Sequence, residues 1–272
     1  MAEVAINFKA TFPNEDSTLI VASRSKQLLI SLDTEYQSNY TLKDNLCLSY
    51  QYDVIDLNTG KSGRDIYYAD IRKKERLSLV EVIENALSTI DMNFSQIKGY
   101  TVLIICHSCV AEFLMLKDRD KLKPFIDYIR KTVITNGKST IPMRGYKNRN
   151  KIEFDLMIKD TMLLVPETHR SLKKASELVD KDFKKLDLKP NEISNMLTLM
   201  LESPKRFEAY ALRDTAVTLN LFIKLQIILN RINGTSSEIY STLSSASVNS
   251  FRTTFRKDYG NKGFKDVFRP IK

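Results

Sequence analysis

Residues 27–35, QLLISLDTE, give the strongest indication of how this chain folds. An almost unbroken apolar run that ends in acids is typical of a buried β-strand with carboxylates at its C-terminal end. Residues two apart on a strand point to the same face of the sheet, so Asp33 and Glu35 could bind one metal ion. Acids also end many strands that simply reach solvent, so the pair alone leaves both interpretations open.

Further elements are predicted around this strand. Residues 46–55 and 65–68 are two strands joined by a turn at 58–63, and the apolar run YTVLIIC at 100–106 is typical of a central parallel strand. Three antiparallel strands followed by alternating helices and parallel strands predict an α/β fold with a mixed central sheet flanked by helices. Apolar periodicity predicts the remaining elements: a strand at 154–164 and helices at 78–90, from about 110, at 122–133, at 171–179 and at 204–232.

The composition favours a nucleic-acid partner. Among 272 residues, 42 are Lys or Arg and 33 are Asp or Glu, which gives a net charge of +9 and a pI near 9.3. A basic surface attracts polyanions through counterion release, although solubility alone would also explain it. The three cysteines, with no secretory leader pattern and no long apolar run, predict an intracellular protein that is not secreted and has no membrane partner.

A second acid-bearing motif lies in the long helix predicted at 204–232. Tyr210 and Asp214 are four residues apart and share one helical face with apolar neighbours. An aspartate that points inward needs a cation, because a buried unpaired charge is unfavourable. A metal ion and an ion pair with Lys or Arg at the helix–sheet contact both meet this need.

Cys106 and Cys109 follow the apolar strand directly and form a CxxC motif. Such a motif is found in redox proteins and in zinc sites. A zinc site needs a second pair of ligands, and Cys47 with His169 is poor material for one. Packing of buried cysteines at a strand end is the simpler interpretation.

In their order along the chain, the acidic motifs resemble those of the DEDD 3′–5′ exonucleases in the tyrosine version. Asp33-x-Glu35 is similar to the first motif and Tyr210-x-x-x-Asp214 to the third. The sequence FEAYALRDTA at 207–216 is similar to the third-motif helix of family B DNA polymerases, and TLSSAS at 242–247 is similar to the segment that follows it there. The resemblance implies an RNase H-like exonuclease domain at 27–234, an N-terminal segment at 1–26, and a basic C-terminal extension at 235–272 that resembles the start of a polymerase part.

The second motif departs from the family pattern. The family has Asn followed by Phe-Asp, whereas residues 107–112 here read HSCVAE, so Glu112 stands where an aspartate is expected. Glutamate also coordinates Mg²⁺, but its extra methylene moves the oxygens by more than the ~0.5 Å tolerance of a preorganised site. Asp155, preceded by Phe154, is the fallback for this acid, although it comes too late in the chain for the same helix and is a weaker candidate than Glu112.

The resemblance implies a two-metal nuclease that removes nucleoside 5′-monophosphates from a single-stranded 3′ end, with DNA as substrate in preference to RNA. Two divalent ions, Mg²⁺ or Mn²⁺, would clamp the scissile phosphate and activate water. Tyr210 would orient that water, and a polymerase part or another replication protein is the implied partner. The implied metal ligands are Asp33, Glu35, Glu112 and Asp214.

A basic stretch predicted as a loop or hairpin supplies the candidates for contact with the nucleic-acid backbone: Arg144, Tyr146, Lys147 and Arg149. A merely solvated basic loop has the same composition. Because the second motif is altered, the alternative function is a catalytically silent exonuclease-like module that binds nucleic acid or a partner protein within a family B polymerase assembly.

Overall fold

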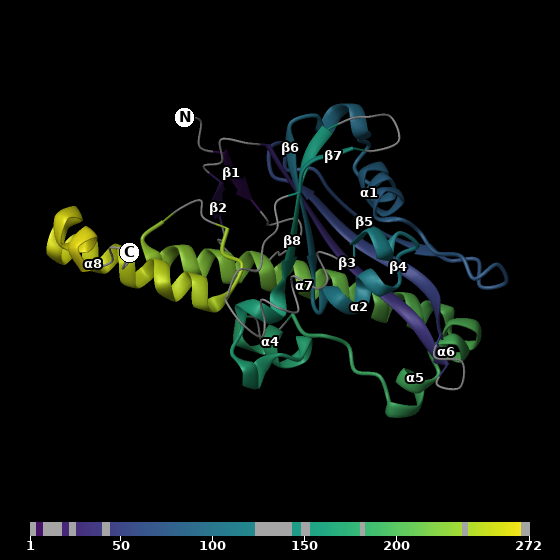
Figure 1. The fold of residues 1–272 in the computed structure, drawn as a ribbon. Coiled ribbons are helices and arrows are strands. Elements are labelled where there is room, and N and C mark those ends of the chain that lie inside the picture. Colours follow the sequence, from purple (N-terminus) through teal and green to yellow (C-terminus); the bar gives the residue numbers. More distant parts are fainter. Residues whose placement is uncertain are drawn as a thin grey trace.

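The computed structural model of the chain describes residues 4–7, 18–21, 26–39, 44–122, 143–147, 153–179, 183–235 and 239–267. At 4–7, 18–21, 39, 44, 143–147, 153, 179 and 261–267 it describes the backbone only. The fold is α/β and RNase H-like, as predicted, and a six-stranded mixed sheet runs through it in the order β5-β4-β3-β6-β8-β7 (Figure 1). The strands are β3 (Lys26–Asn39), β4 (Asp44–Asp56), β5 (Ser62–Tyr68), β6 (Tyr100–Cys106), β7 (Met143–Lys147) and β8 (Glu153–Asp160). A separate antiparallel pair consists of β1 (Val4–Asn7) and β2 (Thr18–Val21).

The sheet changes from antiparallel to parallel pairing at β3. This strand pairs antiparallel with β4, which pairs antiparallel with β5, and on its other side β3 pairs parallel with β6. β6 in turn pairs parallel with β8, and β7 closes the edge antiparallel to β8. The predicted mixed sheet, with antiparallel strands first in the chain and parallel strands after them, is therefore confirmed, and the acid-bearing strand lies inside the sheet.

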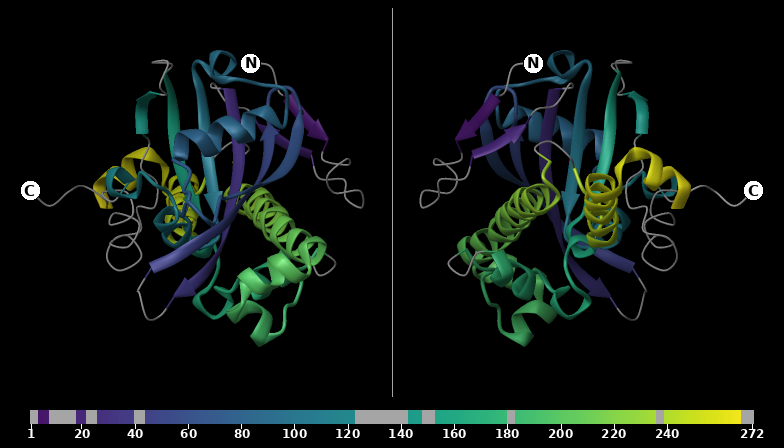
Figure 2. Two further views of the ribbon diagram at one scale, coloured as in Figure 1. Left: turned by 90° about the vertical axis from the view of Figure 1, so that its right-hand side faces the viewer. Right: turned by 90° about the vertical axis from the view of Figure 1, so that its left-hand side faces the viewer.

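Each face of the sheet packs against its own helices (Figure 2). Leu28, Ile30 and Leu32 point to the face covered by α1 (Leu79–Ser88) and α2 (Cys109–Leu114). Leu29, between them, points to the opposite face, where the long helix α7 (Pro204–Asn233) and α4 (Leu172–Val179) pack. The other helical segments are η2 (Phe94–Ile97), η3 (Thr161–Leu164), η4 (Glu167–His169), α5 (Pro190–Ser194), α6 (Met196–Glu202) and α8 (Leu243–Val267).

Helix α7 begins and ends where its sequence signals predict. Pro204 occupies the first turn, where its missing N–H is no loss, and Gly234 ends the helix with a φ of 63°. Ser203 precedes the helix but makes no side-chain cap bond. By length and composition α7 could cross a membrane, yet 78% of its most apolar window is buried inside the protein, as in the central helix of an α/β domain.

The structure adjusts two expectations and leaves most of a third outside the described residues. The strand predicted at 154–164 ends at Asp160, because the Asp160 carboxylate accepts a hydrogen bond from Met162 N and starts the 3₁₀ helix η3. The helix predicted at 122–133 lies outside the described residues from 123 onwards. Of the basic stretch, residues 143–147 form the edge strand β7.

The beginning of the predicted C-terminal extension packs against α7. Tyr240 exchanges two backbone hydrogen bonds with the Gln226 side chain, at 2.8 and 2.9 Å, and is buried in the core beneath the sheet. Helix α8 then leads away from the sheet beyond the end of α7 (Figure 1). The boundary at residue 234 stays a prediction.

Candidate metal centre

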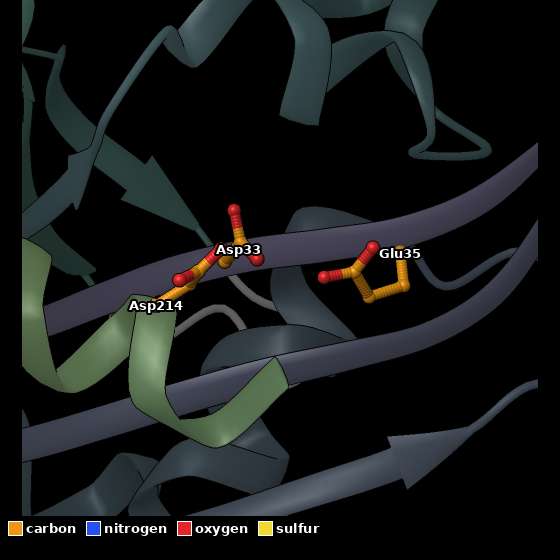
Figure 3. Close-up of side chains that lie close together, drawn as sticks. All are labelled: Asp33, Glu35 and Asp214. Atoms are coloured by element: carbon orange, nitrogen blue, oxygen red, sulfur yellow. The ribbon is translucent and has the colours of Figure 1, made fainter. Parts of the chain in front are cut away.

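Three carboxylates from two distant segments meet at the contact between β3 and α7. Asp33 and Glu35 project from the same face of β3, and Asp214 projects from α7 toward them (Figure 3). One oxygen atom of each residue lies within 4.8 Å of the other two. The strand alternation and the helical spacing that suggested this meeting are thus both present in the structure.

Burial and mutual repulsion disfavour the charged forms of these three carboxyl groups. Burial, and then the neighbouring Asp214, raise the pKa of Asp33 to about 8, and Lys185 opposes the shift. Burial and the same two acids also raise the pKa of Glu35 well above its ordinary value. Burial raises the pKa of Asp214, although Lys185 and Tyr210 favour its charged form. A bound cation would therefore favour the ionised form of all three carboxyl groups.

The residues present fit a divalent ion. Asp214 Oδ1 is buried, and among the described residues it has no hydrogen-bond partner. An orphaned buried carboxylate oxygen is unfavourable unless a cation binds it. Hard carboxylate oxygens are the ligands that Mg²⁺ and Mn²⁺ prefer.

Lys185 is a site residue that the sequence did not single out. Its Nζ forms an ion pair with Asp214 Oδ2 and lies 4.8 Å from the centre of the Tyr210 ring. Burial disfavours the charged ammonium, but Asp214 and Tyr210 outweigh burial and raise the pKa of Lys185. The ion pair with Lys or Arg that the sequence left open is therefore formed in this state of the protein.

The segment that carries Lys185 is attached to α7 by Arg213. The Arg213 guanidinium stacks 3.9 Å from the centre of the Phe183 ring, and its Nε donates to Lys184 O at 2.7 Å. Two contacts from one α7 residue thus hold the loop beside Asp214, the next residue of the helix. Since Lys184 and Lys185 are adjacent, only the conformation of this loop decides which of them reaches the acid.

Tyr210 lies beside Asp214 with 7% of its surface exposed. Burial, and then Asp214, raise the pKa of the phenol, although Lys185 opposes them. The hydroxyl consequently stays protonated at neutral pH and can donate a hydrogen bond. It is suited to orient a water molecule and unsuited to act as a base.

Glu112 approaches β3 from the other face. Thr34 points away from Asp33 and Glu35 because side chains alternate along a strand, and its Oγ1 donates to Glu112 Oε2 at 2.5 Å. Burial, and then Asp33, raise the pKa of Glu112, while Thr34 opposes the rise. Glu112 is therefore close enough to interact electrostatically with the cluster but is not one of its three converging acids, so the structure brings together three of the four expected ligands.

The position of Glu112 follows from how α2 begins. Ser108 adopts a left-handed conformation with a φ of 77°, and the backbone N–H groups of Ser108 and Cys109 donate to the Asp160 carboxylate, each at 3.0 Å. Asp160 therefore fixes the first turn of α2 to the end of β8. This attachment determines where the Glu112 side chain can reach.

Asp155 cannot replace Glu112. In the parallel strands, Asp155 aligns with Thr101 and Thr101 aligns with Gln27, six residues before Asp33. Six residues of strand span about 20 Å. Asp155 is thus at the opposite end of the sheet from the three acids.

The basic residues of β7 lie near that same distant end. Tyr146 pairs with Phe154 and Lys147 pairs with Glu153, at the start of β8. The side chains of Arg144, Tyr146 and Lys147 are not described, and Arg149 lies outside the described residues. Their contact with nucleic acid stays a prediction, and the backbone places them away from the acidic cluster.

The residues around the CxxC motif are structural. Burial raises the pKa of Cys106 to about 11 and that of Cys109 well above its ordinary value, so both remain thiols. His107 Nδ1 and Nε2 lie 2.8 Å from Thr161 Oγ1 and 2.7 Å from Arg170 O, and burial lowers the His107 pKa to about 4. A neutral, hydrogen-bonded histidine and buried thiols favour packing over redox or zinc chemistry.

We therefore expect Cys106→Ala and Cys109→Ala, made together, to leave the rate of any nuclease reaction unchanged. The double variant removes only buried sulfur, which affects stability rather than the acidic cluster. A nuclease assay and metal analysis test this. Loss of activity in a protein that is still folded, or one zinc ion per wild-type chain, would contradict it.

Comparisons with known proteins agree with a polymerase relation. The chain is 27% identical over 241 residues to the "Primer-independent DNA polymerase PolB" of Escherichia coli, and the match covers 79% of this chain and 26% of that polymerase. No family model matches the sequence. The chain thus spans about a quarter of the length of this curated relative, and the similarity fits a relation to the family B DNA polymerases.

Proposed function

We propose that this chain contains a metal-dependent 3′–5′ exonuclease domain of the proofreading type, which hydrolyses single-stranded DNA from its 3′ end. The observation that carries the proposal is the convergence of Asp33, Glu35 and Asp214 within 4.8 Å, with each pKa raised. The similarity of the chain to a DNA polymerase supports a role beside a polymerase part or another replication protein.

The proposed chemistry assigns a role to each side chain. Asp33, Glu35 and Asp214 would hold Mg²⁺ or Mn²⁺, which neutralises the scissile phosphate and lowers the pKa of the attacking water. Tyr210 would orient that water through its protonated hydroxyl. Lys185 binds Asp214 Oδ2, so the metal would use Asp214 Oδ1 or displace the ammonium. The products would be nucleoside 5′-monophosphates.

The direct test is a cleavage assay on a labelled oligonucleotide with a single-stranded 3′ end, with Mg²⁺, Mn²⁺ or EDTA. We expect stepwise shortening from the 3′ end, release of nucleoside 5′-monophosphates, and no reaction in EDTA. A 5′-labelled and a 3′-labelled substrate distinguish 3′–5′ from 5′–3′ or internal cleavage. Absence of cleavage with either metal would reject the proposal.

A catalytically silent module is the second candidate, and two observations favour it. Glu112 is hydrogen-bonded to Thr34, outside the cluster, and Lys185 already neutralises Asp214. Such a protein would bind single strands with salt-dependent affinity but would not cleave them. The cleavage assay, combined with a binding assay in EDTA, separates the two candidates.

Glu112→Gln is expected to reduce cleavage about 10- to 100-fold, the range seen when a residue that supports a metal site is lost. The amide lacks the negative charge that Glu112 would add to the three-acid cluster. Glu112→Asp, which restores the residue that the family resemblance implies, should retain or raise activity. Initial rates over a series of Mg²⁺ concentrations measure both effects.

Glu167→Gln is the matched control, because it makes the same change in charge at a side chain that is 84% exposed. An active wild type that is indifferent to Glu112→Gln would show that three acids are sufficient.

A further inference from the structure

Gln51 is a buried amide that lies beside the acidic cluster. It is opposite Asp33 in the antiparallel pairing of β3 with β4, and the next pair on the same face is Glu35 with Ser49. Residues directly opposite in such a pair share one face of the sheet, with Cβ atoms about 4.5–5.5 Å apart. Gln51 is therefore one strand away from the two acids of β3.

The Gln51 side chain points to the α7 side of the sheet. Its neighbour Tyr50 belongs to the core on the α1 and α2 side, so alternation along β4 turns Gln51 the other way. Helix α7 packs on both β3 and β4. Burial raises the pKa of Asp53, and the Thr215 hydroxyl of α7 opposes that rise, which places Thr215 beside β4 two residues from Gln51. Because Asp214 precedes Thr215, α7 brings Asp214 to the same region.

The amide of Gln51 has one satisfied end and one unsatisfied end. Its Nε2 donates to Ser49 Oγ at 2.6 Å, so the amide runs along β4 from the level of Asp33 toward the level of Glu35. Gln51 is 0% exposed, and its Oε1 has no hydrogen-bond partner among the described residues. An amide oxygen only accepts hydrogen bonds, so no rotation of a hydrogen atom can satisfy it.

Two buried acceptors without donors thus belong to one region, namely Gln51 Oε1 and Asp214 Oδ1. The Lys185 ammonium is bound at the other oxygen of Asp214, and the ionised carboxylates of β3 offer only further acceptors. Unpaired buried acceptors are unfavourable. A cation that both oxygens bind would remove both penalties.

The next pair on this face, Ser31 with Asp53, is less suited to that cation. Ser31 Oγ and Asp53 Oδ2 also have no hydrogen-bond partner among the described residues. A serine hydroxyl can turn its own hydrogen toward an acceptor, however, and Arg64 already balances the charge of Asp53 at 2.7 Å. This pair is also one step farther from Glu35 along the strands.

Gln51 has the position that the family resemblance implied for Glu112. Glu112 lies on the other face of the sheet, hydrogen-bonded to Thr34, whereas Gln51 shares the face of the three acids. Amide carbonyl oxygens bind hard divalent cations together with carboxylates. We propose that Gln51 Oε1 is the fourth protein ligand of the metal centre. This inference rests on the proposed nuclease function and adds a neutral ligand to its three acids.

The test measures Mn²⁺ binding by isothermal titration calorimetry of the whole chain at neutral pH, without nucleic acid. Gln51→Met has a side chain of similar length with no oxygen, so its Kd should rise about tenfold or more, as for other residues that support a metal site. Gln51→Glu places a charged oxygen at the same position, so its Kd should fall below that of the wild type.

Thermal unfolding in EDTA separates a ligand from a packing residue. Gln51→Glu should be less stable than the wild type without metal, because it adds a fourth buried acid, and should gain more stability from Mn²⁺. A residue that only fills space would not change metal affinity in opposite directions in the two variants.

Gln27→Met is the matched control. Gln27 is also buried and lies on the same strand as Asp33, six residues or about 20 Å away, so its Kd for Mn²⁺ should equal that of the wild type. An equal loss of affinity in this control would overturn the proposal. Wild-type affinity in Gln51→Met, or weaker binding in Gln51→Glu, would show that Gln51 Oε1 does not bind the ion.

The outcome is independent of catalysis. If the wild type binds Mn²⁺ more tightly than Gln51→Met but does not cleave DNA, the nuclease proposal fails and the ligand assignment stands. If the wild type cleaves DNA and Gln51→Met binds Mn²⁺ like the wild type, the ligand assignment alone fails. If the wild type does not bind Mn²⁺, both are wrong.

Discussion

Asp214→Asn is expected to reduce metal-dependent cleavage of a 3′-overhang oligonucleotide by about 10³-fold or more. The amide keeps the size of the side chain but removes the charge of the acid that joins α7 to the two acids of β3. A bound divalent ion supplies several kcal/mol of charge stabilisation, and about 4 kcal/mol corresponds to 10³ in rate. Single-turnover rates at saturating Mg²⁺ measure the effect on the chemical step.

Asp258→Asn is the control, since Asp258 is exposed on α8 and makes the same change in charge. Thermal unfolding should show that Asp214→Asn is folded, because Lys185 is partly exposed and can be hydrated without its partner. If Asp214→Asn keeps more than a tenth of the wild-type rate, the acidic cluster is not the site of hydrolysis.

A second large effect is expected on stability. In EDTA, the free energy of unfolding should fall as the pH rises from about 4 to about 8. The folded protein holds a proton on Asp33 up to a pKa of about 8, whereas the unfolded chain releases it near 3.8. Between those values the folded state binds more protons, so increasing pH favours unfolding. Glu35, Glu112 and Asp214 act in the same direction because their pKa values are also raised.

Mg²⁺ or Mn²⁺ should reverse this loss. An ion that binds only the folded state stabilises it by about 2.7 kcal/mol at one hundred times its Kd, which corresponds to a Tm increase of about 5–10 °C for a domain of this size. The increase should be larger at pH 8 than at pH 5, where the carboxyl groups are protonated. Calorimetric scans with and without the metal measure both trends.

Asp33→Asn provides the control for the stability measurement. The variant should be more stable than the wild type in EDTA at pH 8, because one buried like charge is gone, and should gain little from the metal. A wild type whose Tm does not respond to either ion at pH 8 would contradict the assignment of the cluster as a metal site.

Lys185 connects these two predictions. It partly neutralises the cluster when no other cation is bound, which favours the coexistence of three closely spaced acids in a folded domain. Because the same ammonium competes for Asp214, it would also weaken the proposed metal binding. The Lys185 ammonium thus binds an acid that the proposed nuclease reaction would need as a metal ligand.

Local patterns in the sequence determined most of the fold and four of the site residues. The apolar run before Asp33 specified a buried strand, and alternation placed Asp33 and Glu35 on one face. The four-residue spacing of Tyr210 and Asp214 placed both on the inward face of α7, and Pro204 and Gly234 marked its ends. These features depend on a period of two or 3.6 residues and on backbone preferences, so a single segment is sufficient to predict them.

The tertiary structure alone decided what each of these residues contacts. Glu112 reaches Thr34 rather than the cluster, because Asp160 fixes the start of α2 from a different strand. Lys185 rather than Lys184 reaches Asp214, because Arg213 holds the loop in one conformation. A cavity of about 700 Å³ is likewise lined by residues from three distant segments, which are β4, the turn after β5 and the stretch after α2. Such contacts join segments that are distant in the chain, and no local period carries information about where two distant segments will meet.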